Sequence, residues 1–246
     1  MDATEKQILD LELIERILNR VDLNWLEHVV GDTGVKTFII AGNSLNRDTP
    51  HDIDIYQDAT ESPYENKLFK NVAQSVDQQP DALNGKDTKL ICRTDNAVTI
   101  RHSGVTYQFC KYSKGFEALI RSFDYAHVRV GIKFNIDRLT RPVVYYTSEY
   151  ITYLLTGHSK YIGTEYPMSS LLRAEKYRRY EILNNHEYRL SVLRALGDML
   201  IRGFEDYEDF KDQLNAIDLR DLEGEETLAA KSLYDICCER GLVKHP

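Results

Sequence analysis

The pattern of apolar and polar positions divides the first part of the chain into one helical region and two strands. Apolar residues recur at helical spacing over residues 4–30, and Gly31 ends the pattern. The run VKTFIIAG (35–42) is apolar and rich in β-branched residues, which predicts a buried strand ending at a glycine. HDIDIYQ (51–57) alternates strictly and predicts a second strand. Between the two strands we expect a loop or a short helix.

Shorter elements follow in the middle of the chain. Residues 62–76 predict a helix, with Ser62 as its N-cap and Pro63 in the first position. Three short strands come next, separated by turn-forming pairs at Asp95-Asn96 and Ser103-Gly104. After them we expect a helix, a segment that fits either strand or helix, and a last strand. The segments, in order, are KLICRT, AVTIRH, VTYQFCKY, KGFEALIRSF, DYAHVRVGIKFN and RPVVYYT.

From residue 167 onward the pattern is almost entirely helical. The order of elements therefore predicts an α+β protein. Residues 1–166 would form a head with an N-terminal helix, and residues 167–246 a helical neck and tail.

Composition narrows the class of protein. No run of about 18 apolar residues occurs, and the acidic N-terminus does not resemble a secretory signal, so we expect a cytoplasmic protein without a membrane span. The spacing of the four cysteines fits no zinc-ligand pattern and is better explained by buried, reduced thiols.

The charge is unevenly distributed. The net charge is -8, with seven bases against three acids in residues 111–141 and twelve acids against five bases in residues 203–246. This balance argues against a nonspecific coat of nucleic acid and suits a protein that handles phosphates at one site. Ordinary solvated surface charge explains the distribution equally well.

The stretch FIIAGNSLNRDTPHDIDIY (38–56) carries the strongest chemical signal. Alternate residues of a strand point to one face, so Asp52 and Asp54 would lie side by side while Ile53 and Ile55 enter the core. Two close carboxylates favour a cation between them, and oxygen ligands favour Mg²⁺. Alternatively, the two aspartates are an exposed structural pair on an edge strand.

Gly42 and Ser44 add a second element to this stretch. A glycine allows backbone amides to approach a triphosphate closely, and a serine hydroxyl can donate to a phosphate oxygen. Together with Mg²⁺ they would suit an in-line displacement at phosphorus.

These motifs resemble the nucleotidyltransferase superfamily that includes DNA polymerase β, and especially the heads of tRNA CCA-adding enzymes and poly(A) polymerases. That family carries a glycine turn followed by Asp-x-Asp on the next strand. Three later segments resemble further parts of the family, so the resemblance covers about residues 35–180. The segments are AVTIRHSGVTYQFCKY (97–112), RSFDYAHVRVGIKFN (121–135) and SSLLRAEKYRRY (169–180).

The resemblance implies a polymerase β-like head in which a mixed sheet is flanked by helices, and it assigns roles to individual residues. Asp52, Asp54 and Asp124 would be catalytic, and the first two would bind Mg²⁺. The nucleotide would be bound by Gly42, Asn43, Ser44, Arg47, Gln108, Arg173 and Lys176. One face of the helix over 169–180 would contact nucleotide or RNA, and the other would form pairs with Glu175 and Glu181.

The chain departs from the family pattern at several positions. Gln108 stands where the family has a third carboxylate, and an amide cannot act as a general base. Either Asp124 or another acid fills this role, or catalysis is weak or absent. Leu45 replaces the arginine after the glycine turn, for which Arg47 could substitute. Ala126 and Val128 replace a threonine and an asparagine, which suggests a different nucleotide preference.

The leading hypothesis is a Mg²⁺-dependent enzyme that transfers a nucleoside monophosphate from a nucleoside triphosphate to an RNA end, a small molecule or a protein. The alternative is a catalytically degenerate module of the same fold that binds a nucleotide or a partner. A third possibility is that the helical tail assembles the chain into a larger complex. The sequence leaves the oligomeric state open.

Overall fold

A computed structural model describes residues 2–46, 52–60, 64–78, 87–137, 141–215 and 226–245. The chain forms two compact units. The first comprises Met1–Phe123 and His127–Thr152, and the second comprises Asp124–Ala126 and Tyr153–Pro246. Backbone hydrogen bonds from Ala126 to Lys160 and from Ile162 to Asp124 join the two segments of the second unit. The sequence-based boundary between head and tail was residue 166. The second unit of the structure begins earlier, because it includes Tyr153 onward and the short segment Asp124–Ala126.

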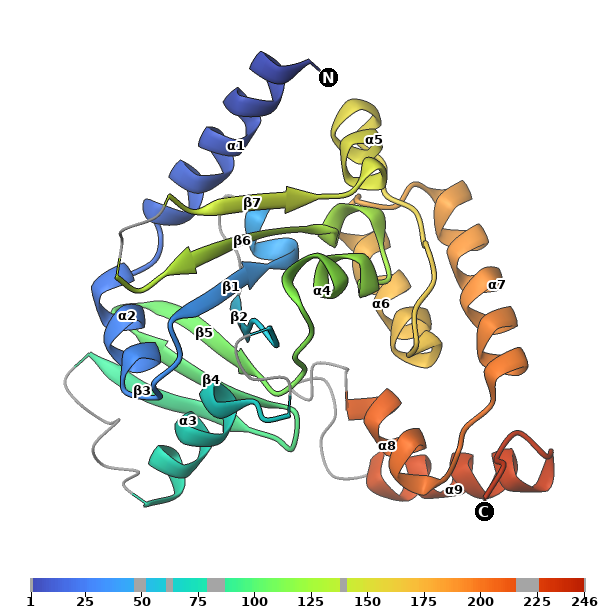
Figure 1. Cartoon of the computed structure of the whole chain (residues 1–246). Helices are drawn as coiled ribbons and strands as arrows, with labels where there is room; N and C mark the ends of the chain where they lie inside the picture. Colours follow the sequence, from blue (N-terminus) through green and yellow to red (C-terminus); the bar gives the residue numbers. More distant parts are fainter. Residues whose placement is uncertain are drawn as a thin grey trace. The chain divides into compact units, whose positions relative to one another are not determined.

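The first unit is built on a sheet that has seven strands within the described residues, in the order β3-β4-β5-β2-β1-β6-β7 (Figure 1). Neighbouring strands are antiparallel except for β2 and β5, which are parallel. The predicted α+β class with a mixed sheet is therefore confirmed. The strands are β1 (Thr37–Ala41), β2 (Ile53–Gln57), β3 (Thr88–Arg93), β4 (Ala97–His102), β5 (Val105–Cys110), β6 (Val130–Asn135) and β7 (Val143–Tyr146).

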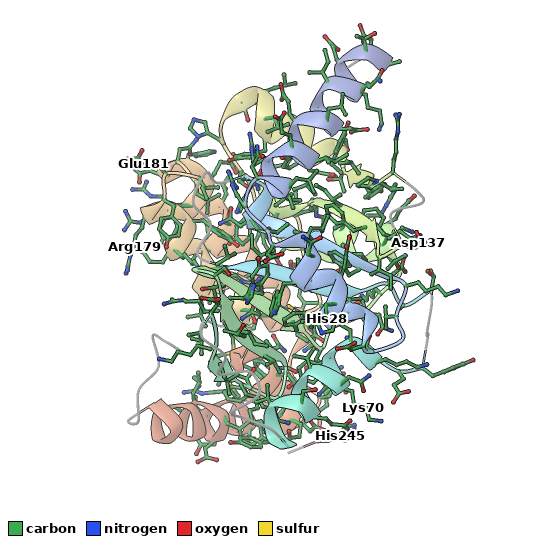
Figure 2. All side chains as sticks on the ribbon, turned by 90° about the vertical axis from the view of Figure 1, so that its left-hand side faces the viewer. His28, Lys70, Asp137, Arg179, Glu181 and His245 are labelled. Atoms are coloured by element: carbon green, nitrogen blue, oxygen red, sulfur yellow. The ribbon has the colours of Figure 1, made fainter. Side chains whose placement is uncertain are left out.

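Helices cover both faces of this sheet. Ile39 and Ala41 of β1 pack against α4 (Phe116–Ser122) on one face. On the other face lie the fully buried side chains of Ile53 and Ile55. The helices of that face are α2 (Leu23–Gly31) and α3 (Lys67–Gln78), marked in Figure 2 by His28 and Lys70.

The single helical region expected over residues 4–30 is two helices in the structure. The first, α1, spans Ala3–Leu18, and α2 begins after a new N-cap. The Asp22 side chain accepts the backbone N–H of Trp25 at 3.0 Å, which satisfies a donor that the start of a helix leaves open. The expected cap of the third helix, Ser62 with Pro63, lies outside the described residues.

The segment that fitted either strand or helix contains a short 3-10 helix, η2 (Ala126–Val128), followed by strand β6. Sequence reasoning did not anticipate α5 (Ser148–Thr156), which follows β7.

The second unit is helical, as predicted, with α6 (Pro167–Arg179), α7 (Asn185–Arg202), α8 (Tyr207–Asn215) and α9 (Glu226–Glu239). Its core contains Met168, Phe204, Phe210, Cys237 and Val243. All four cysteines are free thiols, although only Cys237 is buried and the other three are partly exposed. Within the described residues, the helices are too short or too polar to cross a membrane.

Candidate functional site

The turn after β1 lies directly beside Asp54. Ala41 is paired with Asp54 across β1 and β2, and the short 3-10 helix η1 (Gly42–Leu45) follows. Gly42 has φ +85°, and a Cβ added there would lie 3.7 Å from Asp54 Oδ2. This backbone conformation strongly favours glycine. The glycine turn and the second aspartate of the motif are thus neighbours, as the sequence pattern requires.

Asp52 and Asp54 differ in burial from the isoleucines beside them. Both aspartates are partly exposed, whereas Ile53 and Ile55 have no exposed surface. This alternation confirms that β2 turns its isoleucines into the core. The Asp54 carboxylate belongs to the opposite face, which also carries Ala41 and packs on α4. Asp52 precedes β2, and its charge acts on Cys110 as that of Asp54 does.

The Cys110 thiol lies close enough to the two aspartates to be affected by their charge, and the sequence did not single it out. Although the Cys110 residue is partly exposed as a whole, its thiol group is buried. This burial raises the pKa of the thiol well above its ordinary value, and the charge of Asp54 raises it further. Asp52 also raises this pKa, while a hydrogen bond with Tyr56 lowers it. The thiol is therefore held neutral close to both carboxylates. The signal in the sequence was alternation, because Cys110 lies two positions after Gln108 on the same face of β5.

Gln108 occupies the expected place of the third carboxylate. It is paired with Asp54 across the parallel strands and with Thr99 on its other side. Its Nε2 donates to Thr99 Oγ1 at 3.4 Å, which leaves Oε1 as the accepting end of the amide. Among the described residues, no group of three or more His, Cys, Asp or Glu side chains is arranged to hold a metal ion.

The donor set nevertheless fits Mg²⁺ in its chemistry. Asp52, Asp54 and Gln108 offer oxygen atoms, which are the ligands that a hard cation prefers. In the turn, Asn43 Oδ1 is buried and has no hydrogen-bond partner within the described part of the chain. An acceptor oxygen in this state is suited to a donor or cation from outside the protein.

Two residues of the turn have structural contacts. Ser44 is 2% exposed, and its hydroxyl donates to the Ala41 carbonyl at 3.3 Å. The hydroxyl thus stabilises the turn in this structure, and the predicted bond to a phosphate oxygen would require it to change partner. Leu45, at the position of the family's arginine, is fully buried. Arg47, the proposed substitute, lies outside the described residues.

The other predicted site residues belong to the second unit. Asp124 is 3% exposed, accepts Ser170 Oγ at 2.6 Å and pairs with Arg173 Nε at 3.4 Å. Lys176 is exposed. The structure brings Asp124 and Arg173 together within this unit, and their roles in binding a nucleotide stay predictions.

The helix that carries Arg173 also forms the expected acidic–basic pairs with Glu175, whereas Glu181, the other expected partner, lies beyond the end of the helix. Arg178 and Arg179 both donate to Glu175, at 2.6–2.9 Å and 3.2 Å. This part of the helix is therefore occupied by its own ion pairs.

A hollow of about 430 Å³ lies on the other face of the first unit, between α2 and α3. Trp25, Asn71, Ser75 and Ile100 line it. Ile100 is the strand neighbour of Thr99, so its side chain points to the face opposite to Gln108 and Asp54. This hollow is therefore separate from the candidate site.

No protein-family model and no curated protein match the chain. Several solved structures are similar to it. A CCA-adding enzyme of Thermotoga maritima complexed with tRNA is 15% identical, and the match covers 84% of this chain and 50% of that one at a TM-score of 0.47. A CCA-adding enzyme in complex with ATP is 13% identical, and the match covers 82% of this chain and 58% of that one at a TM-score of 0.44.

An apo tRNA-processing enzyme is 10% identical, and the match covers 73% of this chain and 47% of that one at a TM-score of 0.43. The chain spans about half the length of these solved structures.

Proposed function

We propose that the chain is a nucleotidyltransferase. An acceptor oxygen would attack the α-phosphorus of a nucleoside triphosphate, the bond from that phosphorus to the bridging oxygen of the β-phosphate would break, and pyrophosphate would leave. The acceptor proton would pass to solvent. The observation that supports this most strongly is the position of Gly42, whose left-handed backbone lies beside the Asp54 carboxylate.

Each residue of this site has a role in the proposal. Asp52 and Asp54 would hold Mg²⁺, which when bound neutralises negative charge on the phosphates. Gly42 would let the backbone of the turn approach the triphosphate, because a side chain there would fill the space beside Asp54. Asn43 would offer to the ligand its Oδ1, which has no hydrogen-bond partner among the described residues. Positioning and charge would account for most of the rate.

Gln108 gives this site a distinct character. It accepts hydrogen bonds but cannot remove a proton, so the acceptor would lose its proton without help from this position. The acceptor class stays open among an RNA end, a small molecule and a protein hydroxyl. Asp124, Arg173 and Lys176 are proposed to contact the nucleotide, as the family resemblance implies.

The second candidate function is binding without turnover. The glutamine at the third-carboxylate position favours it, since the described site has two carboxylates rather than three. A nucleotide would then bind at the same turn without releasing pyrophosphate.

The first prediction separates these functions. With Mg²⁺ and each radiolabelled nucleoside triphosphate, the chain should release pyrophosphate and label an acceptor. Asp54→Asn should lower this rate about 100- to 1000-fold, because it removes a charge that stabilises the transferring phosphate. Binding should be measured in parallel by calorimetry.

The matched control is Asp137→Asn, which alters an exposed carboxylate of the same unit (labelled in Figure 2). It should leave the rate unchanged. Nucleotide binding without pyrophosphate release from the unaltered chain would support the second function, and no binding at all would exclude both.

A further inference from the structure

Two arginines of the N-terminal segment reach the turn that follows β1. Arg16 Nη1 donates to the backbone carbonyl of Leu45 at 2.7 Å, and Arg20 Nη1 donates to that of Ser44 at 3.3 Å. Both arginines are partly buried. Two consecutive carbonyls at the end of η1 are therefore bound by positively charged groups from another part of the chain.

The packing of α1 brings these arginines to the turn. Leu13 and Ile17 are 1% and 0% exposed and fix the inner side of the helix. Arg16 follows Leu13 by three residues within α1, and Arg20 lies in the turn just after the helix ends at Leu18. The carbonyl that Arg16 binds belongs to Leu45, whose side chain is fully buried.

The arginines approach from the face of the sheet opposite to Asp54. Lys6 of α1 lies over the ring of Tyr146, whereas Phe116 of α4 packs on Tyr145. Adjacent strand residues point to opposite faces, so α1 and α4 lie on opposite sides of β7. Asp54 belongs to the face that α4 covers, and α1 therefore contacts the turn from the opposite face of the sheet.

We propose that Arg16 and Arg20 are positioning residues for the phosphate-binding turn. Their charge-assisted hydrogen bonds would hold η1 in the shape that places Gly42 beside Asp54. They would also supply positive charge to a turn whose family arginine is replaced by the apolar Leu45, and so favour an anionic ligand. This inference rests on the proposed function, because it takes the ligand of the turn to be a triphosphate.

Four variants test the inference. Arg16→Met and Arg20→Met remove the donors, Arg16→Lys keeps the charge but loses the guanidinium geometry, and Lys6→Met removes a charge from the same helix far from the turn. For each, calorimetry with ATP and Mg²⁺ gives the Kd, and hydrogen exchange with mass spectrometry gives the protection of residues 38–46. Circular dichroism checks the fold.

Each methionine variant should raise the Kd for ATP about tenfold, which corresponds to losing one charged hydrogen bond. Exchange within residues 42–46 should become faster in the same variants. Arg16→Lys should show the faster exchange with a smaller rise in Kd, and Lys6→Met should change neither quantity. If a methionine variant does not fold, Arg16→Lys and Arg20→Lys replace it.

Unchanged exchange in the turn would overturn the positioning role, whatever the Kd. Faster exchange with an unchanged Kd would show that the arginines serve the fold alone and would overturn the link to phosphate. If the unaltered chain binds none of the nucleoside triphosphates, the proposed function fails and the link to phosphate fails with it. The exchange data then decide separately whether Arg16 and Arg20 hold the turn.

Discussion

The two ends of β2 carry aspartates in different surroundings. At its start, Asp52 and Asp54 are partly exposed, and Gly42 lies next to Asp54. Just after its end, Asp58 is 1% exposed. There Oδ1 accepts the backbone N–H and hydroxyl of Thr60 at 3.0 and 2.8 Å, and Oδ2 pairs with Lys133 at 3.3 Å.

The difference shows how one residue type serves two purposes along a strand. At Asp58, other residues of the protein neutralise the charge and satisfy both oxygens, so this carboxylate contributes to the fold. At Asp54, a glycine turn keeps a side chain out of the adjoining space, so this carboxylate suits a ligand. The large loss of activity expected for Asp54→Asn therefore has a counterpart at the other end of the strand, where a loss of stability is expected.

Asp58→Asn should lower the free energy of unfolding by about 1–3 kcal/mol, because the substitution leaves Lys133 without its buried partner. Urea denaturation followed by fluorescence measures the change, since the one tryptophan of the chain, Trp25, lies in the first unit. Transfer activity of the folded variant should stay close to normal. A large loss of activity at full stability would contradict the structural role of Asp58.

Gly42→Ala tests the other end of the strand. At φ +85° an alanine costs about 1–2 kcal/mol in backbone energy, and its Cβ would lie 3.7 Å from Asp54 Oδ2. We expect the Kd for nucleotide with Mg²⁺ to rise about tenfold or more, in proportion to that cost. The same substitution at Gly104, in the β4–β5 turn at φ +84°, meets no atom within 4 Å. Gly104→Ala should lower the free energy of unfolding by about as much as Gly42→Ala and leave the Kd for nucleotide unchanged.

Asp22 is a partly exposed carboxylate to which we assign a structural role rather than a ligand, and Asp22→Ala tests this assignment. The Asp22 side chain is 41% exposed, yet it caps α2 and lies 3.3 Å from His102 Nε2. Removing it should lower the free energy of unfolding by about 1 kcal/mol, as expected for a lost N-cap. Nucleotide binding should be unaffected.

The contribution of Asp22 should also depend on pH. The backbone N–H of Trp25 is the main cause that lowers the pKa of Asp22 below its ordinary value of 3.8. The stabilisation is therefore complete above the unfolded pKa and is lost as the pH falls through the lower, folded pKa. The difference between the urea midpoints of the parent and Asp22→Ala should shrink progressively as the pH falls below 3.8, and a difference that does not shrink would contradict the assignment.

The sequence predicted the parts of this site that depend on local pattern. The alternation of HDIDIYQ gave the faces of Asp54 and Ile55, and the glycine ending an apolar run gave the turn. Contacts between distant segments could not be predicted in this way. Arg16 binds the Leu45 carbonyl because α1 folds back onto the turn, and no local pattern encodes that bond.

The same limit explains the details that sequence reasoning missed in the site. The parallel pairing of β2 with β5 places Gln108 beside Asp54 and brings Cys110 near both aspartates. Strand pairing of this kind depends on the topology of the whole sheet. Likewise, the bond from Ser44 to the Ala41 carbonyl depends on the tight geometry of η1, which the residue types alone do not fix.

Cys110 offers the smallest but most direct test of the comparison between the two ends of β2. The negative charge of Asp54 contributes to the raised pKa of this thiol, whereas Asp58 is not among its causes. Asp54→Asn should therefore lower the pKa of Cys110 and increase its thiolate fraction at a fixed pH near 8.5. We expect alkylation of Cys110 by iodoacetamide to become about two- to fivefold faster, because burial remains the larger cause of the shift. Mass spectrometry of the peptide that contains Cys110 measures this rate separately from those of the other three thiols. Asp58→Asn should leave it unchanged, and equal acceleration by the two variants would mean that general loosening of the strand, rather than the charge of Asp54, controls the thiol.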